Sequence, residues 1–452
     1  MTAPPIGLSY ARALQALGER GRFGVRLGLG RTRALLDGLG NPERTVRGAL
    51  VAGTNGKGSV LALADSALRA AGYRVGSTPK PHLVSYRERV QVDGRPIAAD
   101  DFSRLVSRVL EVSDAIAPRH GEPTEFELLT AVVFARFAEV RPDVALVEVG
   151  LGGRLDATHA WDGGVAVVTN VDLDHTEQLG DTVTAIAREK AAIIERGDLA
   201  VTGADGEGLA VIRRRARRLG VLLTEARPAP LIDWDRDGIE VELPGLGRTR
   251  VGLRGRHQAA NVAIADALLD ALEVAGIASA SVAARRAGYA TAVWPGRLEL
   301  LGIGGRDVLL DGAHNPAGAA ALAVALDDLR PFLTDGPLTL LTASMADKDV
   351  DGVIAALVHA GALARATVVC TSLDLPRALP AQELAARWRA QHRDGTIVAE
   401  PDPIAALDRV LEGPGAANGP LVVAGSLYLV GAARGHLVDD LELRDPDPSE
   451  DA

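Results

Sequence analysis

The 452-residue sequence is poor in cysteine and in aromatic residues, and each scarcity excludes something. Its single cysteine, Cys370, rules out an intramolecular disulfide and fits a reducing compartment. Because Cys370 ends the apolar run 366–370, we interpret it as a small core residue and not as a nucleophile. Aromatic residues make up only 3% of the chain, whereas Ala, Leu, Val and Gly are abundant. This composition favours helices and buried parallel strands over an aromatic-rich β-sandwich.

Long apolar runs and an excess of positive charge are also missing. The sequence has no apolar stretch of about 18 residues and no signal-peptide pattern near its start, so we expect a cytoplasmic protein without a membrane span. The formal net charge of −10 argues against nucleic-acid binding, which needs a basic footprint. The longest cationic run, at residues 213–218, is expected on the solvated face of a helix.

The length of the chain predicts two domains, because one hydrophobic core rarely organises this many residues. Apolar runs at residues 48–52, 144–149 and 164–169 alternate with helix-like segments, of which 60–71 is the first. This alternation predicts an α/β fold with a parallel sheet covered on both faces. Ligands bind beyond the carboxyl ends of the strands in such folds, so functional residues are expected there.

The pattern changes between residues 231 and 254, where short alternating pieces such as 238–243 predict a small antiparallel β insert. A helix is expected over 258–275, and the turn-rich residues 294–296 are interpreted as the domain boundary. Strands expected at 307–311, 338–341 and 421–425 then predict a second, Rossmann-like α/β domain. We therefore expect domains at 1–296 and 297–440, followed by a disordered acidic tail at 441–452.

A glycine-rich segment between the first strand and the first helix reads Gly53-Thr54-Asn55-Gly56-Lys57-Gly58-Ser59. Glycines let backbone N–H groups converge on phosphate oxygens, the helix N-terminus favours negative charge, and Lys57 supplies a cation. The Ser59 hydroxyl is a candidate ligand for Mg²⁺. The segment departs from the strict phosphate-loop pattern, because Val51 occupies the first glycine position and Gly58 follows the lysine.

Three further polar groups follow predicted strands. Glu148 ends one apolar strand, and His175 follows the next. Lys190 lies in the segment 188–193, which is expected to open a helix. A carboxylate beside a buried strand is costly unless a cation or hydrogen bonds satisfy it. Each group has an ordinary alternative, since such a histidine often caps or packs and such a lysine is usually solvated. Their shared position at strand ends favours one active site that holds a metal and a carboxylate substrate.

Several long motifs resemble the folylpolyglutamate synthase and dihydrofolate synthase branch of the Mur ligase superfamily. They cover residues 10–434 in the family's order. The motifs are GTNGKGS (53–59), HLVSYRERV (82–90), TEFELLT (124–130), VEVGLGGRLDAT (147–158), NVDLDHTEQLG (170–180), REKAAII (188–194), WPGRLE (294–299), LDGAHNP (310–316) and GSLYLVG (425–431).

The resemblance implies roles for individual positions. Lys57, His175 and an N-carboxylated Lys190 match catalytic positions, and Ser59, Glu148 and His175 match ligands of Mg²⁺. The positions that match contacts to ATP are Gly53, Thr54, Asn55, Gly56, Lys57, Gly58, Ser59, Asn261, Arg297, Asp311 and His314. Those that match the pterin-binding segments of bifunctional enzymes are Thr124, Glu125, Phe126, Glu127, Leu155, Asp156 and Ala157.

One departure concerns the segment Thr78-Pro79-Lys80-Pro81-His82. Family members commonly carry Thr-Ser-Pro-His here, and the serine contributes to the Mg²⁺ site. One alignment places Lys80 at that serine. A protonated lysine cannot ligate a metal, although it can neutralise a phosphate. Either Thr78 or Ser77 replaces the serine, or this metal contact is missing.

The resemblance implies an ATP- and Mg²⁺-dependent ligase that adds L-glutamate to dihydropteroate, to folate, or to both, by way of an acyl phosphate. The TEFE and Leu155–Ala157 matches favour both activities. Closure of the two domains about residues 294–296 is expected to assemble the site. A monomer is expected from the family, without nucleic-acid or membrane partners. Two alternatives are another Mur-type ligase acting on UDP-linked muramoyl compounds and a non-catalytic nucleotide-binding regulator.

Overall fold

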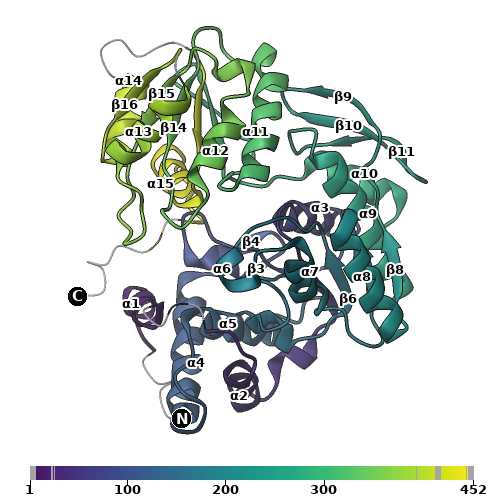
Figure 1. Ribbon diagram of the computed structural model, residues 1–452. Coiled ribbons are helices and arrows are strands. Elements are labelled where there is room, and N and C mark those ends of the chain that lie inside the picture. Colours follow the sequence, from purple (N-terminus) through teal and green to yellow (C-terminus); the bar gives the residue numbers. More distant parts are fainter. Residues whose placement is uncertain are drawn as a thin grey trace. The chain divides into compact units, whose positions relative to one another are not determined.

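The computed structural model describes residues 7–21, 24, 26–392, 394–412, 419–443 and 445 (Figure 1). The chain divides into two compact units. The first unit comprises Met1–Pro228, Ala260–Gly288 and Leu441–Ala452, and the second comprises Ala229–Ala259 and Tyr289–Asp440. In this division the β insert groups with the C-terminal part of the chain, whereas we expected it within residues 1–296. No helix in the described residues is long and apolar enough to cross a membrane.

The first unit is built on an eight-stranded sheet in the order β4-β3-β2-β5-β1-β6-β7-β8. The six strands from β2 to β8 in this order are parallel, and β3 and β4 join antiparallel at one edge. The strands are β1 (Gly48–Ala52), β2 (Val75–Thr78), β3 (Gln91–Val92), β4 (Arg95–Pro96), β5 (Val144–Glu148), β6 (Gly164–Val168), β7 (Leu199–Thr202) and β8 (Leu222–Glu225).

Every residue of the central strands β1 and β5 is buried, as the continuous apolar runs predicted. A core cluster joins alternate residues of these strands to helices α1, α2, α4, α5, α7 and α8. The helices of this unit are α1 (Tyr10–Gly21), α2 (Gly30–Gly38), α3 (Lys57–Ala70), α4 (Ala99–His120), α5 (Glu125–Val140), α6 (Thr176–Leu179), α7 (Val183–Ala191) and α8 (Gly206–Leu219), with parts of α9 (Gln258–Val274) and α10 (Val282–Thr291).

The cationic run lies on α8, as predicted, and two of its arginines have partners. Arg213 pairs with Glu225 across the surface, and Arg215 donates hydrogen bonds to the carbonyls of Ala192 and Ile194. The run therefore forms one face of α8, and at least these two arginines bind groups of the same unit.

The second unit contains two sheets. The predicted β insert is a three-stranded antiparallel sheet formed by β9 (Leu231–Asp235), β10 (Gly238–Leu243) and β11 (Gly247–Val251). The other sheet has the order β12-β13-β17-β14-β15-β16 and is parallel except at β12. Its strands are β12 (Glu299–Ile303), β13 (Arg306–Asp311), β14 (Thr339–Thr342), β15 (Thr367–Cys370), β16 (Thr396–Ala399) and β17 (Leu421–Ala424).

Helices α11, α12 and α13 share one core cluster with alternate residues of β13, β14, β15 and β17. The helices of the second unit are α11 (Pro316–Leu329), α12 (Val350–Leu357), α13 (Ala381–Gln391), α14 (Pro403–Glu412) and α15 (Leu427–Leu437). Cys370 belongs to this core, and burial raises the pKa of its thiol to about 12. The interpretation of Cys370 as a core residue is confirmed.

The acidic tail expected at 441–452 is described only in part. Leu441–Leu443 and Asp445 belong to the first unit, while 444 and 446–452 lie outside the described residues. One carboxylate oxygen of Asp445 accepts hydrogen bonds from Tyr10 Oη at 2.9 Å, Ser85 Oγ at 2.7 Å and Arg87 Nε at 3.3 Å. These contacts fix the described part of the tail on the first unit.

Candidate active site

The glycine-rich loop follows β1 and leads into α3, as its sequence predicted. Gly53 has φ 155° and Gly56 has φ 80°, values that side chains rarely adopt. A Cβ atom at Gly53 would collide with the Thr169 hydroxyl, and one at Gly56 would collide with the Asn261 amide. Asn261, predicted to contact nucleotide, therefore lies directly against the loop within the same unit.

Two lysines converge on one carbonyl oxygen of this loop. The Gly53 oxygen accepts hydrogen bonds from Lys57 Nζ at 3.0 Å and from Lys190 Nζ at 2.9 Å, and Lys57 also donates to Thr54 O at 3.1 Å. Two ammonium groups at this spacing repel each other, and burial makes the repulsion more costly. Burial, together with the charge of Lys57, lowers the pKa of Lys190 to about 7, against the attraction of Asp174 and Asp156.

Lys190 lies near the end of a helix. We predicted that the segment 188–193 opens a helix, and this was wrong, because α7 spans Val183–Ala191. The helix begins more than one turn earlier than predicted, because Thr182 caps its N-terminus. The Thr182 side chain accepts a hydrogen bond from Ala185 N. The ammonium of Lys190 reaches the loop from the last turn of this helix.

Glu148 is the last residue of β5 and is only 3% exposed. Its Oε2 accepts a hydrogen bond from Lys80 N at 2.9 Å, and its Oε1 lies 4.0 Å from Lys57 Nζ. Ser59 is buried in the first turn of α3. The hydroxyl and carboxylate oxygens of these two residues fit Mg²⁺, which binds proteins through one or two carboxylates and completes its shell with phosphates and water.

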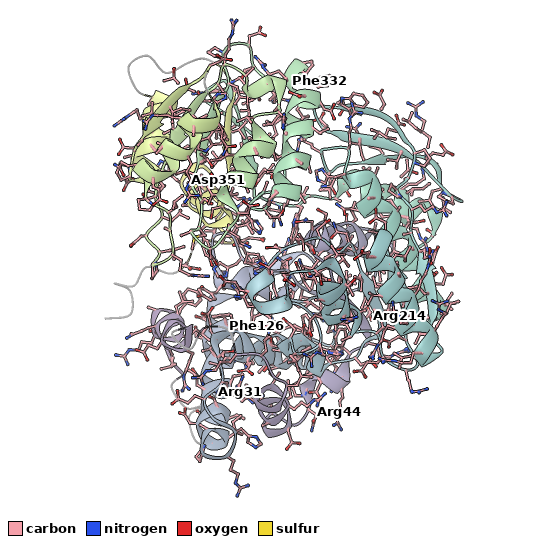
Figure 2. All side chains as sticks on the ribbon, viewed as in Figure 1. Arg31, Arg44, Phe126, Arg214, Phe332 and Asp351 are labelled. Carbon is pink, nitrogen blue, oxygen red and sulfur yellow. The ribbon has the colours of Figure 1, made fainter. Side chains whose placement is uncertain are left out.

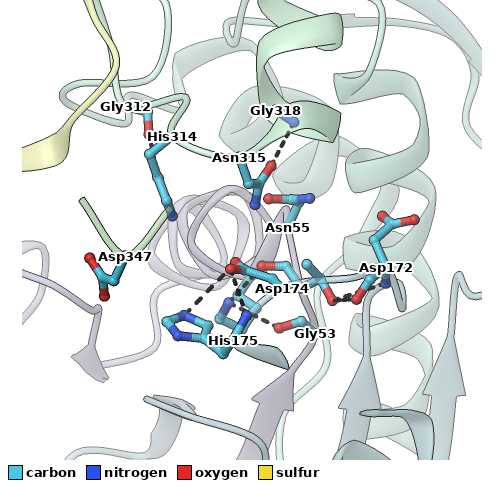
Figure 3. Close-up of polar contacts among 12 residues, drawn as sticks. Gly53, Asn55, Asp172, Asp174, His175, Gly312, His314, Asn315, Gly318 and Asp347 are labelled. Carbon is cyan, nitrogen blue, oxygen red and sulfur yellow. Dashed lines mark hydrogen bonds and ion pairs between the residues drawn. The ribbon is translucent and has the colours of Figure 1, made fainter. Parts of the chain in front are cut away.

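His175, the third predicted metal ligand, occupies a different environment. It is exposed, has φ 51° at the start of α6, and its Nε2 lies 3.8 Å from Asp174 Oδ2 (Figure 3). No group of three or more His, Cys, Asp or Glu side chains in the described residues is arranged to hold a metal. The role of His175 as a ligand therefore stays a prediction.

The segment that follows β6 is tied to the glycine-rich loop by polar contacts. Asn55 N donates to Asn170 Oδ1 at 2.8 Å, and the Thr54 hydroxyl contacts the backbone of Asp172. These bonds hold the start of the DLDH segment beside the loop, a coupling between distant sequence positions that the motifs alone did not reveal.

The predicted pterin-binding residues Thr124 and Glu127 form a capping box at the start of α5. Glu127 Oε2 accepts hydrogen bonds from Thr124 N at 2.8 Å, Thr124 Oγ1 at 3.1 Å and Arg31 Nε at 2.9 Å. Glu125 and Phe126 are partly exposed on the first turn of the same helix, and Phe126 is labelled in Figure 2. Arg31 was not identified from the sequence, because nothing local links it to a glutamate 96 positions away.

The second predicted pterin segment is also partly structural. Asp156 is buried and accepts hydrogen bonds from Leu151 N at 2.8 Å and from Thr158 N and Oγ1. Ala157 is buried and Leu155 is partly exposed. The ring of Phe126 packs against Gly150 at the start of this loop, so the two predicted segments meet.

Lys80 extends from the end of β2 into this region. Its Nζ donates a hydrogen bond to Glu148 O at 2.6 Å and lies 4.7 Å from the centre of the Phe126 ring. Burial lowers the pKa of Lys80 to about 8, and Asp156 and Glu148 oppose that shift. Thr78 and Ser77, the suggested replacements for the family's serine, are both buried within β2.

A second group of side chains follows Lys80. His82 Nδ1 accepts a hydrogen bond from Arg89 Nε at 2.9 Å and its ring lies 4.2 Å from that of Tyr86. Burial and the neighbouring Arg89 lower the pKa of His82 to about 3, so this imidazole is neutral. These residues belong to the motif HLVSYRERV, for which we predicted no individual roles.

In the second unit, three predicted nucleotide contacts gather at the carboxyl end of β13. Asp311 ends the strand and accepts hydrogen bonds from Leu298 N and Ala313 N, both at 2.9 Å. Its pKa is raised by burial, although Arg297 opposes the shift. His314 Nδ1 donates to Gly312 O at 2.8 Å (Figure 3). A Cβ at Gly312 would collide with Arg297. The structure thus brings Arg297, Asp311 and His314 together.

The glycine-rich loop and the β insert both lie in the part of the chain that matches a Mur ligase domain, which makes this fold that of a Mur-type ligase. The Mur ligase middle domain matches residues 51–269 and the C-terminal domain of dihydrofolate synthetase matches residues 304–434. The second match favours the folate branch over ligases that act on muramoyl compounds, and the predicted α/β fold is confirmed.

Comparison with known proteins identifies the branch. The chain is 33% identical to a Bacillus subtilis dihydrofolate synthase/folylpolyglutamate synthase over 95% of its own length and 99% of that protein's. It is similar to a Mycobacterium tuberculosis folylpolyglutamate synthase solved with ADP and AMPPCP, with 32% identity, a TM-score of 0.83 and coverage of 97% and 100% of the two chains. A bifunctional enzyme solved with Mn, AMPPNP and L-glutamate is 28% identical, with a TM-score of 0.79 and coverage of 96% and 100%. The chain belongs to the dihydrofolate synthase/folylpolyglutamate synthase family.

Proposed function

We propose that this enzyme uses ATP and a divalent cation to join L-glutamate to the carboxylate of dihydropteroate, to the γ-carboxylate of tetrahydrofolate, or to both. The observation that carries the proposal is the meeting of Lys57 and Lys190 at Gly53 O, with Glu148 4.0 Å from Lys57. This arrangement suits phosphoryl transfer to a carboxylate. The ligands of the solved relatives, ADP, AMPPCP, AMPPNP, Mn and L-glutamate, support it.

A carboxylate is a poor electrophile, so the reaction needs two steps. In the first, a carboxylate oxygen attacks the γ-phosphorus of ATP, ADP leaves, and an acyl phosphate forms. In the second, the neutral amine of glutamate attacks the acyl carbon, phosphate leaves, and the nitrogen loses a proton to give the amide. The protein contributes by positioning reactants and stabilising charge.

The proposed roles of the residues follow from their places. Lys57 binds the phosphates together with the N–H groups of the glycine-rich loop, and Asn261 supports the loop. Ser59, Glu148 and His175 would hold the divalent cation, which offsets the negative charge of the transferring phosphoryl group. Arg297, Asp311 and His314 are the proposed nucleotide contacts of the second unit.

For Lys190 we propose N-carboxylation, as in the family. Carboxylation needs a neutral amine, and the pKa of about 7 supplies one at physiological pH. It also replaces the repulsion between Lys57 and Lys190 by attraction, because the modified side chain is an anion. Phe126 and the neighbouring residues of the two pterin segments are proposed to bind the folate. We also propose a monomer in the cytoplasm, where ATP is available.

Product analysis tests the function. The purified enzyme is incubated with ATP, Mg²⁺ and L-glutamate, and either dihydropteroate or tetrahydrofolate is supplied separately. Mass spectrometry is expected to show addition of one glutamate to at least one of them, with release of an equal amount of phosphate. A panel that includes UDP-linked muramoyl compounds serves as the control. Turnover of only those compounds, or of none, would contradict the proposal.

A further inference from the structure

Lys80 occupies a position between two parts of the first unit. On one side, its backbone N donates to Glu148 Oε2 at 2.9 Å and its Nζ donates to Glu148 O at 2.6 Å. On the other side, its Nζ lies 4.7 Å from the centre of the Phe126 ring, in the predicted pterin segment. The residue thus contacts the proposed metal ligand Glu148, through its backbone and its side chain, and its ammonium also lies at the proposed folate site.

The ammonium group has capacity for a further ligand. An ammonium carries three N–H donors. Within the described residues, one of the three donates a hydrogen bond, to Glu148 O, and the other two have no hydrogen-bond acceptor. Glu148 and Asp156 are the nearby anions that attract the group, and Arg89 is the cation that repels it. Both carboxylates already accept hydrogen bonds from backbone groups. Glu148 accepts from Lys80 N, and Asp156 accepts from the N–H groups of Leu151 and Thr158.

A carboxylate is the ligand that best satisfies such a group. Hydrogen bonds between ammonium and carboxylate are about twice as strong as neutral ones, and a partly desolvated site strengthens them further. The reaction requires a substrate carboxylate next to the phosphates, which Lys57 and the glycine-rich loop are placed to bind. Lys57 and Lys80 both lie close to Glu148, Lys57 at its carboxylate and the Lys80 ammonium at its backbone oxygen. The Lys80 ammonium also lies against the Phe126 ring, where we propose that the acceptor end of a folate-type substrate binds.

We propose that Lys80 binds the substrate carboxylate that becomes phosphorylated and holds it beside the phosphate loop. This inference rests on the proposed function and extends it by naming the residue that orients the acceptor. When the amine attacks the acyl phosphate, the same ammonium is placed to stabilise the negative charge that develops on the acyl oxygen. Lys80 therefore acts in place of a metal-ligating side chain in this loop.

The test uses the acceptor that wild type glutamylates, dihydropteroate or tetrahydrofolate, and compares its binding with that of an analogue in which hydrogen replaces the reacting carboxylate. Both are titrated by calorimetry in the presence of AMPPCP and Mg²⁺, with wild type, Lys80→Met and Lys80→Arg. Methionine keeps the length and apolar stem and removes the charge, whereas arginine keeps the charge. Arg213→Met, on the surface of α8, is the matched control for loss of one positive charge.

Wild type is expected to bind the carboxylate compound roughly 10- to 100-fold more tightly than the analogue, the range for one charge-assisted hydrogen bond. Lys80→Met is expected to lose most of this preference and to bind ADP as wild type does. Lys80→Arg is expected to retain most of it, which keeps the test valid if Lys80→Met fails to fold.

If Lys80→Met binds the carboxylate compound and the analogue more weakly by the same factor, the role of Lys80 is structural. If Lys80→Met loses only its affinity for ADP, Lys80 contacts a phosphate. Either result overturns the inference, as does an unchanged preference. Failure of the proposed function is recognised separately, because wild type would then form no glutamylated product and would show no preference for the carboxylate.

Discussion

Lysine is rare in this chain, and its positions are informative. Only four of the 49 lysine and arginine residues are lysines, namely Lys57, Lys80, Lys190 and Lys348. The first three contact Gly53 or Glu148 at the carboxyl ends of β1 and β5. A compact ammonium on a flexible stem can lose its proton or be modified, whereas a guanidinium stays charged. This difference suits Lys190 in particular, for which we propose carboxylation of the neutral amine.

The clearest prediction at the residue scale concerns Lys190. Replacing it with alanine removes the proposed anion beside Lys57, and kcat is expected to fall by about 100-fold or more, as for other preorganised electrostatic groups. Acetate is expected to restore part of the activity by supplying a carboxylate in the space left behind. Steady-state kinetics with and without acetate measure this effect. Full activity of Lys190→Ala, or no response to acetate while the variant stays folded, would contradict carboxylation.

Asp198 gives a prediction about pH. It is 5% exposed, and burial together with neighbouring Asp162 raises its pKa from 3.8 to about 7. Between about pH 4 and 7 the folded state binds more protons than the unfolded state, so stability falls as the pH rises. Asp198→Asn is expected to add about 2 kcal/mol at pH 8 and little at pH 4, measured by urea unfolding. Asp114→Asn, at an exposed site, is the control, and equal effects at both pH values would be contrary to this reasoning.

At the scale of elements, two of the predicted substrate residues stabilise a helix. Thr124 and Glu127 satisfy each other's backbone N–H groups at the start of α5, and Glu127 also holds Arg31. Capping of this kind orients the first turn, on which Phe126 is partly exposed. These residues thus support the proposed folate site by fixing its geometry.

Thr124→Ala is expected to lower the free energy of unfolding by about 1 kcal/mol, the usual cost of losing an N-cap. Asn315→Ala provides a matched comparison, because the Asn315 side chain caps α11 in the second unit by accepting from Gly318 N at 2.8 Å. Urea denaturation measures both variants. A large rise in the KM for dihydropteroate without loss of stability would show instead that Thr124 contacts the substrate directly.

At the scale of the whole molecule, the proposed nucleotide contacts are divided between the two units. Lys57 and Asn261 belong to the first, and Arg297, Asp311 and His314 to the second. A ligand that binds only the folded protein stabilises it in proportion to the logarithm of its excess over Kd. The contribution of each unit to nucleotide binding can therefore be measured as thermal stabilisation.

AMPPCP with Mg²⁺, at about 100 times its Kd, is expected to raise the melting temperature of wild type by roughly 5 °C. Lys57→Ala and His314→Ala are each expected to reduce this rise, since each removes a proposed phosphate or nucleotide contact. Differential scanning fluorimetry over a series of nucleotide concentrations measures the effect. An undiminished rise in His314→Ala would remove that residue from the nucleotide site.

The sequence by itself determined most of the elements and the family. The residues 48–52 and 238–243 form strands with the predicted bounds, because continuous and alternating apolar patterns are local signals. The glycine-rich loop was placed correctly between strand and helix for the same reason. The predicted start of α7 was wrong, because we placed it within the motif at 188–194. The capping residue Thr182, which sets the true start, precedes that motif. From its place in the sequence we expected the β insert to belong to the domain at 1–296. In the structure it forms one compact unit with residues 289–440.

Only the tertiary structure decided which side chains meet. The sequence does not show that Lys57 and Lys190, 133 positions apart, share the carbonyl of Gly53, or that Lys80 reaches from Glu148 to Phe126. Parallel strands bring residues from distant loops to one edge of the sheet, and their distances depend on packing that no local pattern encodes. The electrostatic consequences, above all the lowered pKa of Lys190, arise from that burial and proximity.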